Sequence, residues 1–184
     1  RWQDVVLVFP DPNDFKKKKK FAIDIGLPVA IIDKDKETHK AVHAEYILGA
    51  KVNGKICVTL DDMIDTGGTN LSAAEALREA GAKRVIACAT HGILSPKITE
   101  NGVVFAEELF GKSGVEVVTT DTVARTADYR KEHRKWLTTL SCAPLIADLI
   151  YCNETGTSHG EKLEEYKRIA VEGKESDLER FLLK

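Results

Sequence analysis

Residues 55–70 read KICVTLDDMIDTGGTN and lead directly into a helical stretch at residues 71–80. The apolar run at residues 56–60 is typical of a strand that is covered on both faces of a sheet. The run ends at two adjacent aspartates, and a glycine-rich turn separates these from the helix. This order of strand, turn and helix predicts a ligand site at the carboxyl end of a buried parallel strand.

The turn has the chemistry to bind a phosphate group. The backbone amides at residues 66–69 lack partners within the helix and lie at the positive end of its dipole. Gly67 and Gly68 let a ligand approach the backbone closely, and the hydroxyls of Thr66 and Thr69 can donate hydrogen bonds. The two preceding aspartates can accept hydrogen bonds from neighbouring sugar hydroxyls. We therefore predict a site for a phosphorylated sugar.

A purely structural interpretation is a capped helix. Thr66 or Thr69 would make a good N-cap, and acidic residues near the start of a helix are favourable. A cap accounts for one threonine and one aspartate. It gives no reason for three carboxylates, two glycines and two threonines in one short stretch, so we favour the binding site.

The rest of the chain alternates between apolar runs and helical periodicity. Strands are expected at residues 4–9, 29–32, 56–60, 84–89 and 115–119, and helices at residues 15–25, 71–80 and 103–110. Because the strand candidates are continuously apolar, the sheet should be covered on both faces. We predict a three-layer α/β fold in which helices cover both faces of a mostly parallel sheet.

Composition limits the class of protein. The chain has 184 residues, of which 43% are hydrophobic and 30% charged, and its net charge is −2. No basic field favours nucleic acid or an anionic membrane as a partner, and no apolar run approaches the ~20 residues that span a bilayer. The four cysteines form no CxxC pair. We expect free thiols in a soluble, cytoplasmic protein.

The C-terminal part has helical patterns and a turn-like link but no further strand candidate. A helix is expected at residues 145–151, a turn-like link at 153–160, and then an amphipathic tail marked by Leu163, Tyr166 and Ala170. We therefore divide the chain into a domain at residues 1–152 and a linker with a helical tail at 153–184. Because Arg1 opens the chain only a few residues before a core strand, we expect a piece of a longer protein.

Four segments carry a resemblance to a known family. Residues 60–69 resemble the phosphoribosyl diphosphate (PRPP) binding motif shared by type I phosphoribosyltransferases and ribose-phosphate pyrophosphokinases, also called PRPP synthetases. The segments ATHGILS at 89–95 and LSCAPLIA at 140–147, together with Pro10-Asp11, resemble segments of the pyrophosphokinases in the same order. The resemblance covers about residues 4–150 and is to the carboxyl-terminal of their two related domains.

The resemblance implies a type I phosphoribosyltransferase-like fold and a reaction. The diphosphoryl group of ATP would be transferred to ribose 5-phosphate, with Mg²⁺, to give PRPP and AMP. Binding of the 5-phosphate is implied for Asp65, Thr66, Gly67, Gly68 and Thr69, and binding of the ribose hydroxyls, in part through Mg²⁺, for Asp61 and Asp62.

The resemblance also implies a metal ligand and a catalytic loop. Asp11 corresponds to a Mg²⁺ ligand, and Lys34 and Lys36 fall where the family has a mobile Lys-x-Arg loop that closes on the transferring phosphates. Lys36 stands in place of the arginine, and Asn13-Asp14 in place of two glycines. The family's second domain, which supplies ATP-binding residues, is absent. We therefore expect that the 184-residue chain does not make PRPP by itself. We also expect a homo-oligomer.

Two alternatives remain open. One is a type I phosphoribosyltransferase that uses PRPP, although no base-recognising hood is evident. The other is a non-catalytic regulatory subunit associated with PRPP synthetase, which the changes at Lys36 and Asn13-Asp14 would permit.

Weaker signals concern lysine and histidine residues. Most of the lysines at 16–20 are expected to be solvated, although one or two could face the nucleotide phosphates. A zinc site at His39 and His43 is not favoured, because no third ligand is in view. His91 could orient a phosphate or cap a turn.

Overall fold

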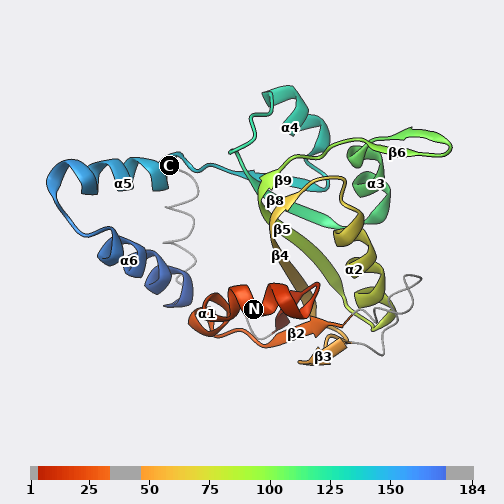
Figure 1. Cartoon of the computed structure of the whole chain (residues 1–184), viewed down its shortest axis with the longest axis horizontal. Helices are drawn as coiled ribbons and strands as arrows, with labels where there is room; N and C mark the ends of the chain where they lie inside the picture. Colours follow the sequence, from red (N-terminus) through yellow and green to blue (C-terminus); the bar gives the residue numbers. More distant parts are fainter. Residues whose placement is uncertain (1–3, 34–46, 173–184) are drawn as a thin grey trace.

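The computed structural model describes residues 4–33 and 47–172 of the chain, the last three of these by their backbone only. Its main sheet has seven strands in the order β3-β2-β1-β4-β5-β8-β9, and β6 pairs with β7 in a separate hairpin (Figure 1). All neighbours in the main sheet are parallel except β2 and β3. The strands are β1 (Val5–Phe9), β2 (Val29–Ile32), β3 (Ile47–Gly49), β4 (Ile56–Ile64), β5 (Arg84–Gly92), β6 (Lys97–Thr99), β7 (Gly102–Val104), β8 (Glu116–Thr120) and β9 (Leu137–Leu140).

Helices cover both faces of this sheet. They are α1 (Pro12–Ile25), α2 (Gly68–Glu79), α3 (Ala106–Ser113), α4 (Ala127–His133), α5 (Ala143–Thr155) and α6 (His159–Glu172). Val6 and Val8 of β1 share a core with Leu77 of α2 and Phe110 of α3. The intervening Leu7 points to the opposite face, where it packs with α1. The prediction of a three-layer α/β fold with a mostly parallel sheet is confirmed.

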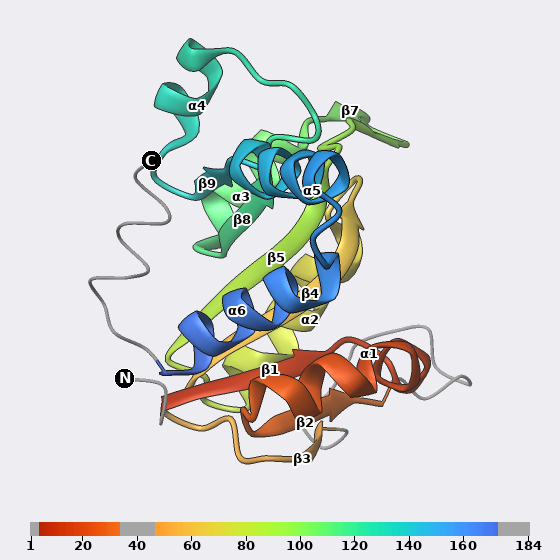
Figure 2. The same cartoon turned by 90° about the vertical axis from the view of Figure 1, so that its left-hand side faces the viewer.

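The sheet has a topological switch point between β1 and β4. From β1 the chain crosses to β2 on one side, whereas β5, β8 and β9 follow β4 on the other side. The helix after β1 and the helix after β4 lie on opposite faces, so their first turns diverge (Figure 2). In open α/β sheets ligands bind in the crevice that this divergence creates at the carboxyl ends of the strands.

Two central strands are longer than predicted. Strand β4 continues past residue 60 to Ile64, and β5 continues past residue 89 to Gly92, with Met63 opposite His91. Strand β1 pairs with β4 only as far as Thr59, so the extension has a neighbour on one side only. Asp61 and Asp62 therefore lie within the end of β4, and the prediction that the strand ends before them was wrong.

Other boundaries also differ. The helix expected at 103–110 begins only at Ala106, because Val103 and Val104 belong to the hairpin strand β7. The link expected at 153–160 is shorter, because α5 runs to Thr155 and α6 starts at His159. Strands β3 and β9 and helix α4 were not predicted. The division of the chain at residue 152 stays a prediction.

Helices α5 and α6 are set apart from the sheet, on the side on which α1 lies (Figures 1 and 2). Tyr166 of α6 donates a hydrogen bond to Asp148 of α5, and Lys167 lies 3.4 Å from Asp24 of α1. The tail therefore contacts the domain through α1. None of the helices in the described ranges is long and apolar enough to cross a membrane.

The four cysteines are free thiols, as predicted. Burial raises the pKa of Cys57 and of Cys88 to about 11. Both thiols therefore stay protonated at neutral pH and act as small apolar side chains.

Candidate functional site

The turn between β4 and α2 leaves backbone amides free at the switch point. Gly67 is the N-cap of α2, with φ 77°, and the first hydrogen bond of the helix runs from Leu71 N to Gly67 O over 2.9 Å. In the described part of the chain, no protein group accepts a hydrogen bond from the main-chain nitrogens at 66–70. These amides are available to an anion from outside the protein.

The two glycines of the turn have different roles. A Cβ atom at Gly67 would lie 2.5 Å from Cε2 of Phe110, so the core and the positive φ both require glycine there. At Gly68 the nearest atom to such a Cβ would be Oγ1 of Thr66, 3.9 Å away. Protein packing does not require a glycine at position 68, whereas a ligand seated on the backbone would.

The carboxylates of Asp61 and Asp62 face away from the core. Their side chains are 31% and 80% exposed. Oδ1 of Asp61 accepts a hydrogen bond from the Asp62 amide at 2.7 Å, which orients the first carboxylate. Both carboxylates can therefore accept hydrogen bonds from a ligand in the crevice, and their binding of ribose hydroxyls stays a prediction.

A lysine from α1 reaches these carboxylates. Nζ of Lys18 lies 2.8 Å from Oδ1 of Asp14, 3.6 Å from Oδ1 of Asp62 and 3.9 Å from Oδ1 of Asp61. It also donates to the carbonyl oxygen of Leu60 at 3.3 Å. The other members of the lysine run are exposed, as predicted, but Lys18 is only 18% exposed. Its contacts with β4 were not predicted, because these partners are remote in the chain.

The charge state of Lys18 follows from these contacts. Burial disfavours the ammonium form, but the hydrogen bond and charge of Asp14, with the charges of Asp62 and Asp61, outweigh it and raise the pKa of Lys18. Lys18 is therefore a fixed cation in the crevice at neutral pH.

Asp11 caps helix α1. Its Oδ1 accepts hydrogen bonds from the amides of Asn13 and Asp14, both at 2.8 Å. This is the ordinary N-cap role of an aspartate, and the role of Asp11 as a Mg²⁺ ligand stays a prediction. Lys34 and Lys36, like His39 and His43, lie outside the described residues.

The segment that follows β5 supports the turn. The amide of Leu94 donates to Ile64 O at 3.0 Å and that of Ser95 to Asp65 O at 3.1 Å. Arg125, which no sequence pattern singles out, holds this segment from the other side. Its Nη2 donates to Gly92 O at 3.3 Å and to Ile93 O at 2.6 Å. The backbone entering the turn is thereby fixed by a neighbouring strand end.

His91 has a protein partner at the end of the sheet. Its Nδ1 lies 2.9 Å from Oγ1 of Thr122, and that hydroxyl contacts the carbonyl oxygen of Thr90 at 3.0 Å. The contact supports the turn-capping interpretation of His91. Its role in orienting a phosphate stays a prediction.

Asp121 anchors the segment that precedes α5. Its Oδ1 accepts from the amide of Cys142 at 2.8 Å, and its Oδ2 accepts from the hydroxyl of Ser141 at 2.7 Å. The Cys142 amide first, and then the Ser141 hydroxyl, hold the pKa of Asp121 below its ordinary value of 3.8.

Replacing Asp121 with Asn should destabilise the chain at neutral pH and not in acid. A pKa that is lowered in the folded state contributes stability above the unfolded-state value, and this is lost as the pH falls through the folded-state value. The gap between the urea midpoints of the original chain and the variant should therefore close as the pH falls below 3.8. A gap of constant size across that range would contradict the assignment.

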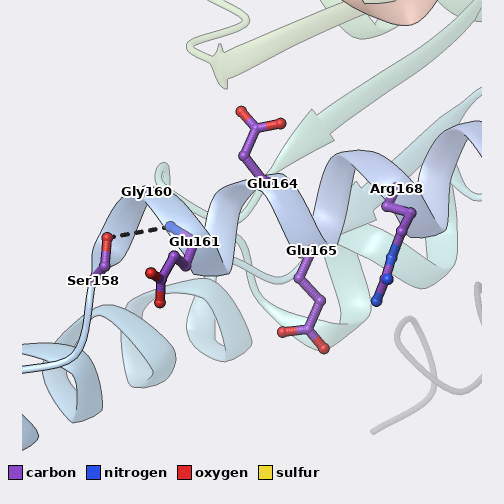
Figure 3. A pocket seen from close by; sticks show the side chains of 6 residues that line it. All are labelled: Ser158, Gly160, Glu161, Glu164, Glu165 and Arg168. Carbon is purple, nitrogen blue, oxygen red and sulfur yellow. Dashed lines mark hydrogen bonds between the residues drawn. The ribbon is translucent and has the colours of Figure 1, made fainter.

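A hollow on the surface of α6 does not have the charge of a phosphate site. Its lining residues are Ser158, Gly160, Glu161, Glu164, Glu165 and Arg168 (Figure 3). Three of the six are glutamates, and the amide of Glu161 is already bonded to Ser158 Oγ at 3.3 Å. An anionic sugar phosphate fits the free amides of the turn instead.

Comparisons with known proteins match most of this chain to one family. The family model described as phosphoribosyl synthetase-associated domain matches residues 44–161. A ribose-phosphate pyrophosphokinase of Clostridium perfringens is 40% identical over 147 residues, which are 80% of this chain and 43% of that protein. One from a Nostoc species is 37% identical over 156 residues, covering 84% of this chain and 44% of that protein.

A solved structure of a phosphoribosylpyrophosphate synthetase also matches this chain. The crystal structure of phosphoribosylpyrophosphate synthetase from Mycobacterium smegmatis matches with a TM-score of 0.63 and 36% identity, covering 84% of this chain and 46% of that one. The chain thus spans less than half the length of these relatives. Because the family model matches well over half of its residues and includes the turn between β4 and α2, the chain belongs to the phosphoribosyl synthetase-associated domain family.

Proposed function

We propose that the chain is the sugar-phosphate-binding domain of a ribose-phosphate pyrophosphokinase, which makes PRPP and AMP from ribose 5-phosphate and ATP. The observation that carries the proposal is the set of free amides at 66–70, at the switch point and beside two exposed carboxylates. The similarity to whole pyrophosphokinases supports it.

The chemistry follows from how the sugar is held. The turn at residues 65–69 holds the 5-phosphate, and Asp61 and Asp62 accept hydrogen bonds from ribose hydroxyls. The anomeric hydroxyl oxygen then attacks the β-phosphorus of ATP and loses its proton to solvent, the bond from that phosphorus to the α-phosphate oxygen breaks, and AMP leaves. The domain contributes mainly by orienting the attacking oxygen, which can account for a large part of such an acceleration.

The donors at this site suit a Mg²⁺ ion that keeps water or substrate phosphates as its other ligands. The described residues contain no group of three or more side chains that could hold a metal ion. Mg²⁺ commonly binds one or two carboxylates, with water and substrate phosphates as the other ligands. Asp61 and Asp62 would hold it together with such ligands, and the resemblance assigns Asp11 as a Mg²⁺ ligand as well. When bound, it neutralises charge on the transferring phosphates.

The remaining roles rest on the resemblance alone. We assign to Lys34 the stabilisation of charge on the transferring phosphates, and to Lys36 the role of the arginine that the family has at this position. A lysine lacks the planar two-pronged grip of an arginine, so this contribution should be weaker. We also propose a homo-oligomer. The free thiols suit the reducing cytoplasm.

Two assays test the proposal. The 184-residue chain should bind ribose 5-phosphate in a calorimetric titration and should bind ribose much more weakly. The full-length product of its gene should form AMP from ATP and ribose 5-phosphate. Release of diphosphate from PRPP only when a base is added would indicate a phosphoribosyltransferase instead. Sugar-phosphate binding with neither activity in the full-length product would indicate a regulatory subunit.

A further inference from the structure

Lys18 links the two elements that form the crevice. It lies on α1, after β1, and its ammonium group contacts the end of β4 through Asp61, Asp62 and the carbonyl oxygen of Leu60. An ion pair within α1 would need only Asp14, which is four residues away. The additional contacts place a cation of the protein at the predicted sugar-binding carboxylates.

The surroundings of Lys18 are strongly acidic. Asp14 is 13% exposed, and its Oδ2 is buried with no hydrogen-bond partner in the described part of the chain. Asp61 and Asp62 add two further negative charges within 4 Å of the ammonium group. One lysine therefore faces three carboxylates, and its removal would leave them to repel one another.

We propose that Lys18 is a positioning residue that acts as a tethered counter-ion of Asp61 and Asp62 when no divalent cation is bound. Mg²⁺ and the ammonium group compete for the same carboxylate oxygens, so the lysine side chain withdraws from them when the metal arrives with the substrates. This inference rests on the proposed function for the identity of the sugar ligand, but the competition itself requires no sugar.

The test is a titration with Mg²⁺ alone. K18M keeps an apolar stem of similar length and removes the charge, and it should bind Mg²⁺ about tenfold more tightly than the original chain, because a cation at ~4 Å no longer repels the metal. The matched control K19M changes an exposed lysine of the same helix and should leave the affinity unchanged. K18R keeps the charge and should bind like the original chain.

Further variants locate the effect and guard against loss of folding. Adding D62N to K18M should abolish the gain, which places the metal at the carboxylate pair. The double variant D14N/K18M lacks one of the three carboxylates, so the remaining two repel each other less. It should still bind Mg²⁺ about tenfold more tightly than D14N alone. The proposal would be overturned by equal Mg²⁺ affinity of K18M and the original chain, by equal affinity of the D14N/K18M double variant and D14N, or by no measurable binding by K18M.

A parallel titration with ribose 5-phosphate separates this inference from the proposed function. If the original chain fails to bind the sugar phosphate while K18M still gains Mg²⁺ affinity, the proposed function fails and the counter-ion role stands. If the sugar phosphate binds and K18M gains nothing, the counter-ion role fails and the proposed function stands.

Discussion

Replacing Gly68 with Ala is expected to weaken the binding of ribose 5-phosphate by about a hundredfold while the chain remains folded. The added methyl group would stand on the exposed backbone where the phosphate must approach. Losing one or two charge-assisted hydrogen bonds, at about 1.5–3 kcal/mol each, corresponds to an effect of this size.

The fold should tolerate alanine at position 68. Gly68 is not in the left-handed region, and a Cβ at this position meets no atom closer than 3.9 Å. Alanine is also a better residue than glycine in the first turn of a helix. The urea midpoint should therefore stay constant or rise slightly.

Gly67 provides the matched control. Alanine there would have to adopt the positive φ of Gly67 and would collide with the ring of Phe110, so the chain should lose about 1–3 kcal/mol of stability. Calorimetry and urea unfolding on both variants separate the two effects. An unchanged affinity in Gly68→Ala would show that the phosphate does not sit on this turn.

Replacing Asp62 with Asn and Thr69 with Val together should abolish measurable binding of ribose 5-phosphate. The change removes one carboxylate acceptor for the sugar and one hydroxyl donor for the phosphate. Both side chains are exposed in the free protein, so stability should stay within about 0.5 kcal/mol of the original. Calorimetry with the sugar phosphate measures the first effect and urea unfolding the second.

A control pair of the same chemistry lies outside the site. Asp128→Asn with Thr138→Val also changes an exposed aspartate and an exposed threonine, on α4 and β9. This pair should bind the sugar phosphate normally. Sugar-phosphate affinity that is equal in the two double variants would remove the assignment of Asp62 and Thr69.

The central strands and the turn could be predicted because their signals are local. Strands β1, β2, β4 and β5 are continuous apolar runs, and such runs identify a sheet that is covered on both faces. The turn carries glycines directly before a helix, so its free amides follow from helix geometry.

The missed features depend on partners that are remote in the sequence. The extension of β4 through Asp61 and Asp62 is stabilised by its ladder with β5, which compensates for residues of low strand propensity. Lys18 and Arg125 act through contacts more than 30 residues away in the chain. Neither contact produces a periodic pattern in the sequence around the residue.

Phosphate binding at the turn is tested most directly by the amide spectrum of a ¹⁵N-labelled chain during titration with ribose 5-phosphate. The largest shifts should fall on the amides at 66–70, ribose without its phosphate should not produce them, and Gly68→Ala should suppress them at the same ligand concentration. Amides at 66–70 that stay unmoved while the sugar phosphate binds elsewhere would contradict phosphate binding at the turn.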